Sequence, residues 1–312
     1  MILSVSALKW LYFMTTKHKQ TVSLVLGSGG ARGLAHIGAI HWLEENGFKI
    51  ESVSGSSIGA VIGGVYAAGK LDSFEEWAKA ITKVDIVTLL DVSWNKNGLI
   101  KGEKIINSLT ELVGDVMIED LPITYTAVAT DILNEKEVWL NSGQLFDAMR
   151  ASMSLPLFFT PFTYKGIELI DGGVLNPVPI APTFNDETDF TIAINLGGKR
   201  DSTKINMEER HSMNHSPSPL ISKIAEFVEN LKGPTTDQAS EEWSALDIVT
   251  LGFDAMQNTI ARQKLAAYPP DHVIEISSNA CGILEFDLAS EMIELGYKKA
   301  HESLGQILHE NE

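Results

Sequence analysis

Two short runs of strand-forming residues near the start of the chain are each followed by glycine-rich sequence and then by a helical pattern. Residues 21–26 are mostly strand formers, and 34–46 has the apolar spacing of a helix that ends at a glycine. The same order recurs with a strand at 50–54, a tight turn at 55–59 and a small-residue helix at 60–68. A strand–turn–helix unit that occurs twice in succession predicts a parallel sheet covered by helices.

The rest of the pattern extends this sheet and its helical cover. An alternating segment at 123–129 predicts a strand that 137–141 can pair with, and the uncharged run 190–196 suits the centre of a sheet. A last strand is predicted at 273–276. Helices are predicted over 73–82, 101–113, 144–152, 221–231, 246–268 and 288–307. We therefore expect an α/β fold, a three-layer sandwich whose mainly parallel central sheet is flanked by helices.

The 312 residues are enough for one large domain with a sheet buried on both faces. We expect a single domain over 21–312 with a polar insertion near 197–219, preceded by an N-terminal extension over 1–20 that need not belong to the fold. Met14 is a candidate start, and an interfacial anchor in the first residues is the alternative. The uncharged segment 52–69 is rich in Gly, Ser and Ala, which favours a buried strand and helix over a membrane span.

Charge and cysteine content narrow the function classes. The chain has 24 Lys and Arg against 41 Asp and Glu, a net charge of −17, which opposes binding to nucleic acid and electrostatic docking on anionic lipid. The single cysteine, Cys281, excludes an intramolecular disulfide and fits a cytoplasmic protein. Cys281 has no neighbouring base in the sequence, so we interpret it as a small packed residue. The His, Asp and Glu residues show no metal-binding spacing, so we expect no metal and no cofactor.

A serine on a sharp turn is the first candidate for chemistry. In Gly55-Ser56-Ser57-Ile58-Gly59, only Ser57 has glycine both two residues before and two residues after it. A nucleophile that projects from a strand-to-helix turn has strained backbone, and side chains at those two positions would collide. The positive end of the following helix favours a developing alkoxide. Ser57 is therefore a candidate nucleophile, and a turn that merely packs tightly is the alternative.

The segment Gly27-Ser28-Gly29-Gly30-Ala31-Arg32-Gly33 also joins a predicted strand to a predicted helix. Arg32 occupies the place of the third glycine of a dinucleotide-binding loop, and the segment does not match a phosphate-binding P-loop. It supplies free backbone amides at Gly29 and Gly30 beside a fixed cation, which is the equipment of an oxyanion hole. A general anion-binding turn is the alternative.

A lone carboxylate is the candidate base. Asp171 follows an apolar pair and precedes Gly172 and Gly173. A serine nucleophile needs a base, and an aspartate can serve if its surroundings raise its proton affinity. An Asp-Gly hairpin turn is the simpler interpretation. Among the histidines, His272 suits the chain order Ser…Asp…His, so a Ser57–Asp171–His272 triad is a competing hypothesis.

Three further features receive structural interpretations. Asp131, at the end of a predicted strand, is a second acidic candidate that we interpret as structural, and His36 lies one turn into a predicted helix. The apolar segment 155–159 and Phe162 could line an acyl channel, but core packing explains them equally well.

Taken in order, these motifs resemble those of the patatin-like phospholipase family, most closely its small single-domain bacterial members. The resemblance runs from about Val22 to Leu196 and on to the C-terminal helix, and Ser28 departs from the commoner form, which has glycine there. Further matching stretches are His36-Ile37-Gly38, Arg150-Ala151-Ser152 through Pro156, Phe159-Thr160-Pro161 and Asn176-Pro177-Val178-Pro179.

The resemblance implies a Ser–Asp dyad without histidine. Ser57 would be the nucleophile and Asp171 the base, while Gly29 and Gly30 would donate to the oxyanion and Arg32 would steady the loop or the anion. The accompanying motif glycines are Gly27, Gly33, Gly55, Gly59, Gly172 and Gly173.

The implied reaction is hydrolysis of phospholipids, lysophospholipids or other acyl esters through an acyl-enzyme, without calcium. The implied partner is a lipid or acyl-ester substrate, reached by transient contact with a membrane surface. A non-catalytic lipid- or anion-binding module that keeps the same loops is the alternative from another class.

Overall fold

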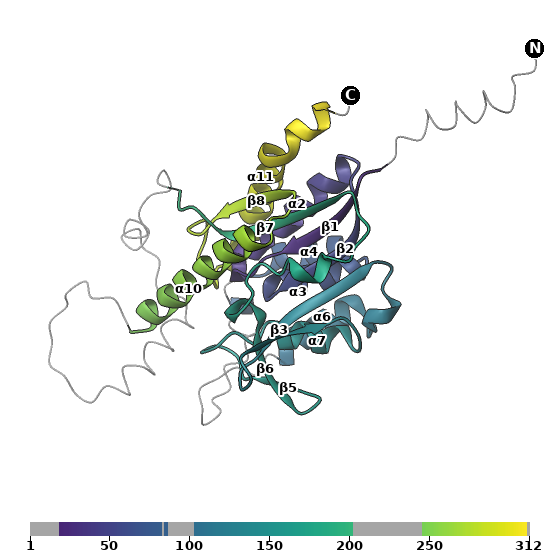
Figure 1. The fold of residues 1–312 in the computed structure, drawn as a ribbon. Helices are drawn as coiled ribbons and strands as arrows, with labels where there is room; N and C mark the ends of the chain where they lie inside the picture. Colours follow the sequence, from purple (N-terminus) through teal and green to yellow (C-terminus); the bar gives the residue numbers. More distant parts are fainter. Residues whose placement is uncertain (1–18, 83, 87–102, 202–244, 311–312) are drawn as a thin grey trace, which may run out of the picture.

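The computed structural model describes residues 19–82, 84–86, 103–201 and 245–310. Within them, one eight-stranded sheet has the order β5-β6-β3-β2-β1-β7-β8, and β4 also pairs with β3 (Figure 1). The strands are β1 Thr21–Leu26, β2 Lys49–Ser56, β3 Thr124–Asp131, β4 Lys136–Leu140, β5 Phe162–Tyr164, β6 Ile167–Asp171, β7 Phe190–Gly198 and β8 His272–Ser277. Strands β3, β2, β1, β7 and β8 run parallel in that order.

Helices cover both faces of the sheet, which confirms the expected three-layer α/β fold (Figure 1). Alternate residues of β1 explain the layering, because successive side chains of a strand point to opposite faces. Val22, Leu24 and Leu26 belong to the large core shared with α2, α3 and α11, whereas Val25 packs with Ala261 of α10. The helices are α2 Ala35–Glu45, α3 Ile58–Ala67, α4 Leu71–Ala80, α6 Glu103–Val113, α7 Leu145–Ser152, α10 Ala245–Ala267 and α11 Ala289–Glu310.

The crossing of α2 and α11 depends on two glycines. A Cβ atom on Gly38 would lie 1.8 Å from the carbonyl oxygen of Ile293, and one on Gly296 would lie 1.8 Å from the carbonyl oxygen of Ala35. Because no side chain fits at such distances, the two helix backbones are in direct contact. This crossing closes the core on the face opposite α10.

The predicted strands and helices agree closely with the structure, with local differences. The strand expected at 50–54 continues to Ser56, and that at 123–129 continues to Asp131. Strands β5 and β6 were not expected, because each is short and antiparallel. The helix expected at 221–231, most of the insertion near 197–219 and nearly all of the extension over 1–20 lie outside the described residues. No described helix has both the length and the apolar character needed to cross a membrane.

Strand β6 meets β2 end to end beside β3. Strands β4 and β6 both pair with Ala129 of β3, so they lie on opposite sides of β3. Strands β4 and β2 both pair with Ala127, so they also lie on opposite sides of β3. Strands β6 and β2 therefore share one side of β3. Ser56 of β2 pairs with Val128, and Asp171 of β6 pairs with the next residue, Ala129. This arrangement brings Asp171 to the carboxyl end of β2, where Ser57 follows.

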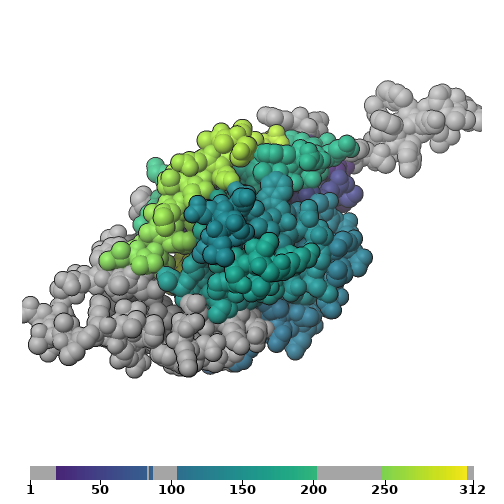
Figure 2. All heavy atoms as spheres, turned by 60° about the horizontal axis from the view of Figure 1, so that its bottom comes forward, coloured from purple at the N-terminus to yellow at the C-terminus, as the bar shows by residue number. Residues whose placement is uncertain are grey.

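Helix α10 lies beside the β3–β4 hairpin on the second face of the molecule (Figure 2). An ion pair between Lys264 of α10 and Glu137 of β4 joins them, and Glu137 also accepts a hydrogen bond from the side-chain amide of Asn176. Through Ala261 and Gln257, the same helix packs over the ends of β1 and β7 and over the segment after Asp171.

Candidate active site

Ser57 occupies a strained turn between β2 and α3. Its backbone has φ 57° and ψ −124°, a conformation that side-chain-bearing residues rarely adopt and that costs about 1–3 kcal/mol. A Cβ atom on Gly55 would lie 2.4 Å from the carbonyl oxygen of Gly59, and one on Gly59 would lie 2.1 Å from that of Leu26. The turn can therefore form only with glycine at both flanking positions.

The Ser57 side chain is hydrogen-bonded to Asp171. Its Oγ donates to Asp171 Oδ2 at 2.5 Å, while the Gly173 amide donates to Oδ1 at 2.7 Å. The aspartate is completely buried, and this burial raises its pKa to about 7, although both hydrogen bonds act in the opposite direction. At neutral pH this carboxylate has a proton affinity suited to general-base chemistry.

The two glycines after Asp171 allow this close approach. A Cβ atom on Gly172 would lie 1.9 Å from the carbonyl oxygen of Val128, which belongs to β3. One on Gly173 would lie 2.4 Å from Nε2 of Gln257 and 2.5 Å from Oγ of Ser28. The segment after the carboxylate is therefore packed between β3, α10 and the first glycine-rich loop.

That loop presents two backbone amides. The Ser28 amide donates to the carbonyl oxygen of Pro177 at 2.8 Å, and the Ala31 amide donates to that of Ile283 at 2.9 Å. Within the described part of the chain, the amides of Gly29 and Gly30 have no such acceptor. They remain free to donate to an anion at this end of the sheet.

The guanidinium of Arg32 is hydrogen-bonded to the backbone of the glycine-rich loop. Its Nε donates to the Gly29 carbonyl oxygen at 3.1 Å, and Nη2 lies 3.3 Å from Oδ1 of Asp254. In a trans peptide the carbonyl and the amide point in opposite directions, so holding the Gly29 carbonyl also orients the Gly30 N–H. The Arg32 side chain is only 4% exposed, and its hydrogen bond to Gly29 is a contact with the loop backbone.

His36 supports the same loop. Its Nε2 lies 2.9 Å from the carbonyl oxygen of Gly27, and burial lowers the pKa of the imidazole to about 4. The ring is therefore neutral at physiological pH, and Nε2–H donates to the carbonyl. This contact agrees with the structural role expected for His36.

His272 is far from Ser57, which contradicts the triad hypothesis. His272 is the first residue of β8 and pairs with Ile192 of β7. Ile192 pairs with Leu24 of β1, which in turn pairs with Val53 of β2. Val53 precedes Ser57 by four residues, and β8 lies three strands from β2, so the separation is on the order of 20 Å. The chain order suited a triad, but His272 begins β8 at the amino-terminal ends of the parallel strands, whereas Ser57 follows the carboxyl end of β2.

Two other residues considered from the sequence have local surroundings that explain them. Asp131 accepts hydrogen bonds from the Leu133 and Asn134 amides and from the Asn134 side chain, which lower the pKa of its carboxyl group. Asp131 therefore closes the β3–β4 turn, as expected of a structural residue. Cys281 is buried. Over the described ranges, no three His, Cys, Asp or Glu residues are grouped as a metal site would require.

The carboxyl end of α7 also contributes to the site. The Ser57 amide donates to Ser152 Oγ at 2.9 Å, and the Asp171 amide donates to the Ser154 carbonyl oxygen at 3.0 Å. The sequence pattern assigned these serines no role, because the partner of Ser152 is 95 residues away in the chain and the contact of Ser154 is made by its backbone carbonyl, which no side-chain pattern reveals. The available signal was two polar residues at the end of a helix that the sheet buries.

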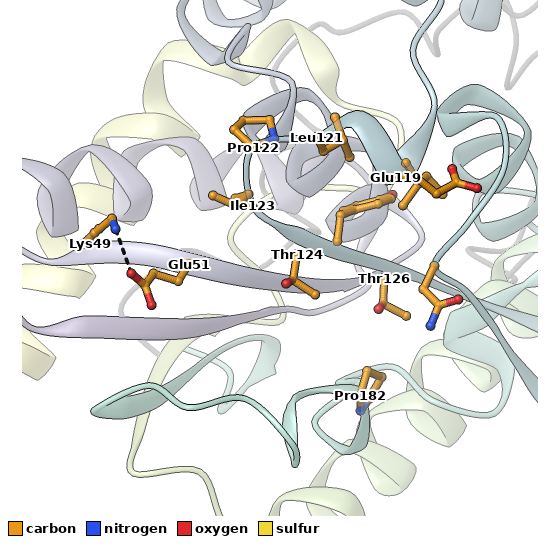
Figure 3. Close-up of a pocket in the computed structure, with 12 residues that line it drawn as sticks. Lys49, Glu51, Glu119, Leu121, Pro122, Ile123, Thr124, Thr126 and Pro182 are labelled. Atoms are coloured by element: carbon orange, nitrogen blue, oxygen red, sulfur yellow. Dashed lines mark hydrogen bonds and ion pairs between the residues drawn. The ribbon is translucent and has the colours of Figure 1, made fainter.

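Two concave regions lie apart from the Ser57–Asp171 pair. A groove of about 620 Å³ lies at the amino-terminal ends of β2 and β3, where Lys49 pairs with Glu51 and Thr124 and Thr126 face Pro182 (Figure 3). A smaller one, of about 330 Å³, lies between α6, α7 and β5. Neither is lined by Ser57 or Asp171.

The apolar segment 155–159, which was considered for an acyl channel, contains both buried and exposed side chains. Phe158 and Phe159 are buried in a small cluster with Leu155 and Leu284, whereas Leu157 is half exposed. The buried pair is thus core, in agreement with the simpler interpretation.

A three-layer α/β fold with a Ser–Asp pair beside the carboxyl end of β2 is an arrangement typical of serine-type hydrolases. The sequence profile of patatin-like phospholipases matches residues 24–184, and the chain belongs to this family. Membership implies lipid acyl-hydrolase activity.

Several known proteins are similar to this chain. Uncharacterized NTE family proteins of Mycobacterium bovis and Mycobacterium tuberculosis are 38% identical over 91% of both chains. Neuropathy target esterase sws of Drosophila melanogaster is 34% identical over 60% of this chain, and lysophospholipase NTE1 of Meyerozyma guilliermondii is 31% identical over 60%. These matches cover only 14% and 13% of those two proteins. The crystal structure of VipD from Legionella pneumophila has a TM-score of 0.44 and 15% identity, covering 94% of this chain and 67% of VipD.

Proposed function

We propose that the protein is a serine acyl-ester hydrolase of the phospholipase A or lysophospholipase type, with Ser57 as nucleophile and Asp171 as base. The observation that carries the proposal is the 2.5 Å hydrogen bond from the strained serine to a fully buried carboxylate whose pKa is raised to about 7. A serine held in this way is poised to lose its proton as it attacks.

The reaction has two steps. Ser57 Oγ attacks the ester carbonyl while its proton moves to Asp171, and the Gly29 and Gly30 amides stabilise the oxyanion. Asp171 then returns the proton to the alcohol oxygen as the ester C–O bond breaks, which leaves an acyl-serine. In the second step a water molecule gives its proton to Asp171 and attacks the acyl carbonyl. The acyl-serine bond breaks, the proton passes to Ser57 Oγ, and the fatty acid is released.

The substrate class and the location belong to the same proposal. Family membership favours lipid esters, and the names of the yeast and fly relatives favour lysophospholipids among them. We place the protein in the cytoplasm, where it meets lipid by transient contact at a membrane surface. The net charge of −17 makes that contact local and apolar.

Labelling with a fluorophosphonate probe tests the proposal without knowledge of the natural substrate. The probe should label wild type, fail to label Ser57→Ala, and label Asp171→Asn at a strongly reduced rate. Ser56→Ala is the matched control, because Ser56 is adjacent and buried and its hydroxyl has no hydrogen-bond partner among the described residues. It should label like wild type, and hydrolysis of lysophosphatidylcholine should follow the same order.

Two outcomes would contradict the proposal. Equal labelling of Ser57→Ala would mean that another residue reacts. A folded wild-type protein that neither reacts with the probe nor hydrolyses the lipid, in detergent micelles as well as in buffer, would favour a non-catalytic lipid-binding module.

A further inference from the structure

We infer that Ser152, at the end of α7, is a positioning residue that holds the nucleophile turn in its reactive conformation. The inference rests on the proposed function, because it concerns how Ser57 is presented to an ester. Ser152 touches the Ser57 backbone and leaves the reacting atoms to Ser57 and Asp171.

The hydroxyl of Ser152 is fixed by two hydrogen bonds. Its Oγ accepts the Ser57 amide proton at 2.9 Å and donates its own proton to the carbonyl oxygen of Val128 at 2.6 Å. The side chain is completely buried, so water cannot replace either partner. Because the donated proton is committed to β3, the oxygen lone pair is aimed at Ser57.

The Ser57 turn needs such a restraint. Its backbone conformation is strained, and strain of this kind persists only where the surroundings over-determine it. A buried amide without a partner would add a further penalty and would favour a relaxed turn in which the amide finds another acceptor. Occupation of the Ser57 amide by Ser152 also leaves oxyanion binding to amides other than that of the nucleophile.

The same helix end fixes the base. Two residues after Ser152, the Ser154 carbonyl oxygen accepts the Asp171 amide at 3.0 Å. Arg150 in turn bonds the Ser154 hydroxyl and the carbonyl oxygen of Thr160, which holds the chain that leaves α7. The segment 150–154 therefore sets the positions of both members of the pair relative to β3.

The test is the kinetics of Ser152→Ala, which removes the acceptor and leaves the space nearly filled. With a soluble p-nitrophenyl ester we expect kcat to fall by about 10- to 100-fold, since misplacement of a reacting group by about 1 Å costs that much. KM should stay within about twofold, because substrate binding does not involve Ser152. The rate of fluorophosphonate labelling should fall in parallel with kcat.

Ser54→Ala is the matched control. Ser54 is also a buried serine that donates to a backbone carbonyl, that of Pro179, but its side chain bonds neither Ser57 nor Asp171. We expect Ser54→Ala to destabilise the fold about as much as Ser152→Ala does, and to keep the wild-type kcat. Should Ser152→Ala not fold, Ser152→Cys, which offers a weak acceptor of similar size, takes its place.

The outcomes separate this inference from the proposed function. A folded Ser152 variant with wild-type kcat, or an equal loss of kcat in Ser54→Ala, would overturn the positioning role while leaving the hydrolase intact. A wild-type protein without turnover or labelling would overturn the proposed function itself.

Discussion

The substitution Asp171→Asn should abolish turnover and, at neutral and alkaline pH, make the fold more stable. Burial raises the pKa of Asp171 from the ordinary 3.8 to about 7, so the folded protein keeps this proton over an interval in which the unfolded chain has released it. Stability contributed by this group is therefore complete below about pH 4 and is lost as the pH rises to about 7, by ~1.4 kcal/mol for each pH unit.

Asparagine is neutral at every pH, so the variant does not lose stability as the pH rises. Its oxygen can still accept the Gly173 amide, and its NH₂ group can donate to Ser57 Oγ, so both contacts of the carboxylate have a replacement. Between about pH 5 and about pH 8, the advantage of Asp171→Asn over wild type should grow by about 3 kcal/mol.

Urea unfolding followed by circular dichroism at the two pH values measures this difference. Asp131→Asn is the control, because hydrogen bonds lower the pKa of that carboxyl and its effect on stability should be the same at both pH values. An Asp171→Asn advantage that does not increase with pH, or a variant less stable than wild type at the higher pH, would refute the argument that burial sets the proton affinity of the base.

Three other outcomes are expected. The kcat/KM for ester hydrolysis should rise through about pH 7 and fall about tenfold per pH unit below it, because Asp171 accepts the serine proton only when ionised; a flat profile speaks against an aspartate base. Gly30→Ala should lower kcat about 100-fold or more, because this proposed oxyanion donor has a φ of +58° and a Cβ there would lie 2.4 Å from the carbonyl oxygen of Ile283. Gly47→Ala, with a φ of +85° but open space, should leave kcat unchanged. Gly38→Ala should destabilise the fold by about 1–3 kcal/mol in thermal melts, because its Cβ would lie 1.8 Å from a backbone carbonyl of α11. Gly252→Ala is the control, because a Cβ there meets open space, and the same melting temperature for both variants would show that α2 and α11 can separate without cost.

Local sequence patterns predicted most of the fold. The first strand was predicted with the bounds that the structure gives, Thr21–Leu26, because an uncharged run of strand formers between a polar segment and glycine has few alternatives. The glycines around Ser57 and after Asp171 indicated where the backbone must turn or approach another segment closely. Those signals depend on a few neighbouring residues, which a single sequence displays directly.

Features that depend on distant pairing could not be predicted in the same way. Strand β6 has five residues and gains its place only by pairing with β3, and Ser152 matters only because α7 ends beside Ser57. His272 shows the converse, since the chain order that suited a triad does not reveal that β8 lies three strands from β2 in the sheet. The packing of α10 against Gly173 belongs to the same class of long-range contacts.

The end-to-end meeting of β2 and β6 has a consequence for the timing of activity during protein synthesis. The proposed nucleophile and base, Ser57 and Asp171, are 114 residues apart in the chain, and β3, against which both strands are aligned, lies between them in sequence. A growing chain that has folded only its first strands thus presents the serine turn with no carboxylate beside it. Because domains of this size acquire their long-range pairings late, esterase activity should begin only when the antiparallel end of the sheet has closed. Until then, the proposed nucleophile has no base to accept its proton.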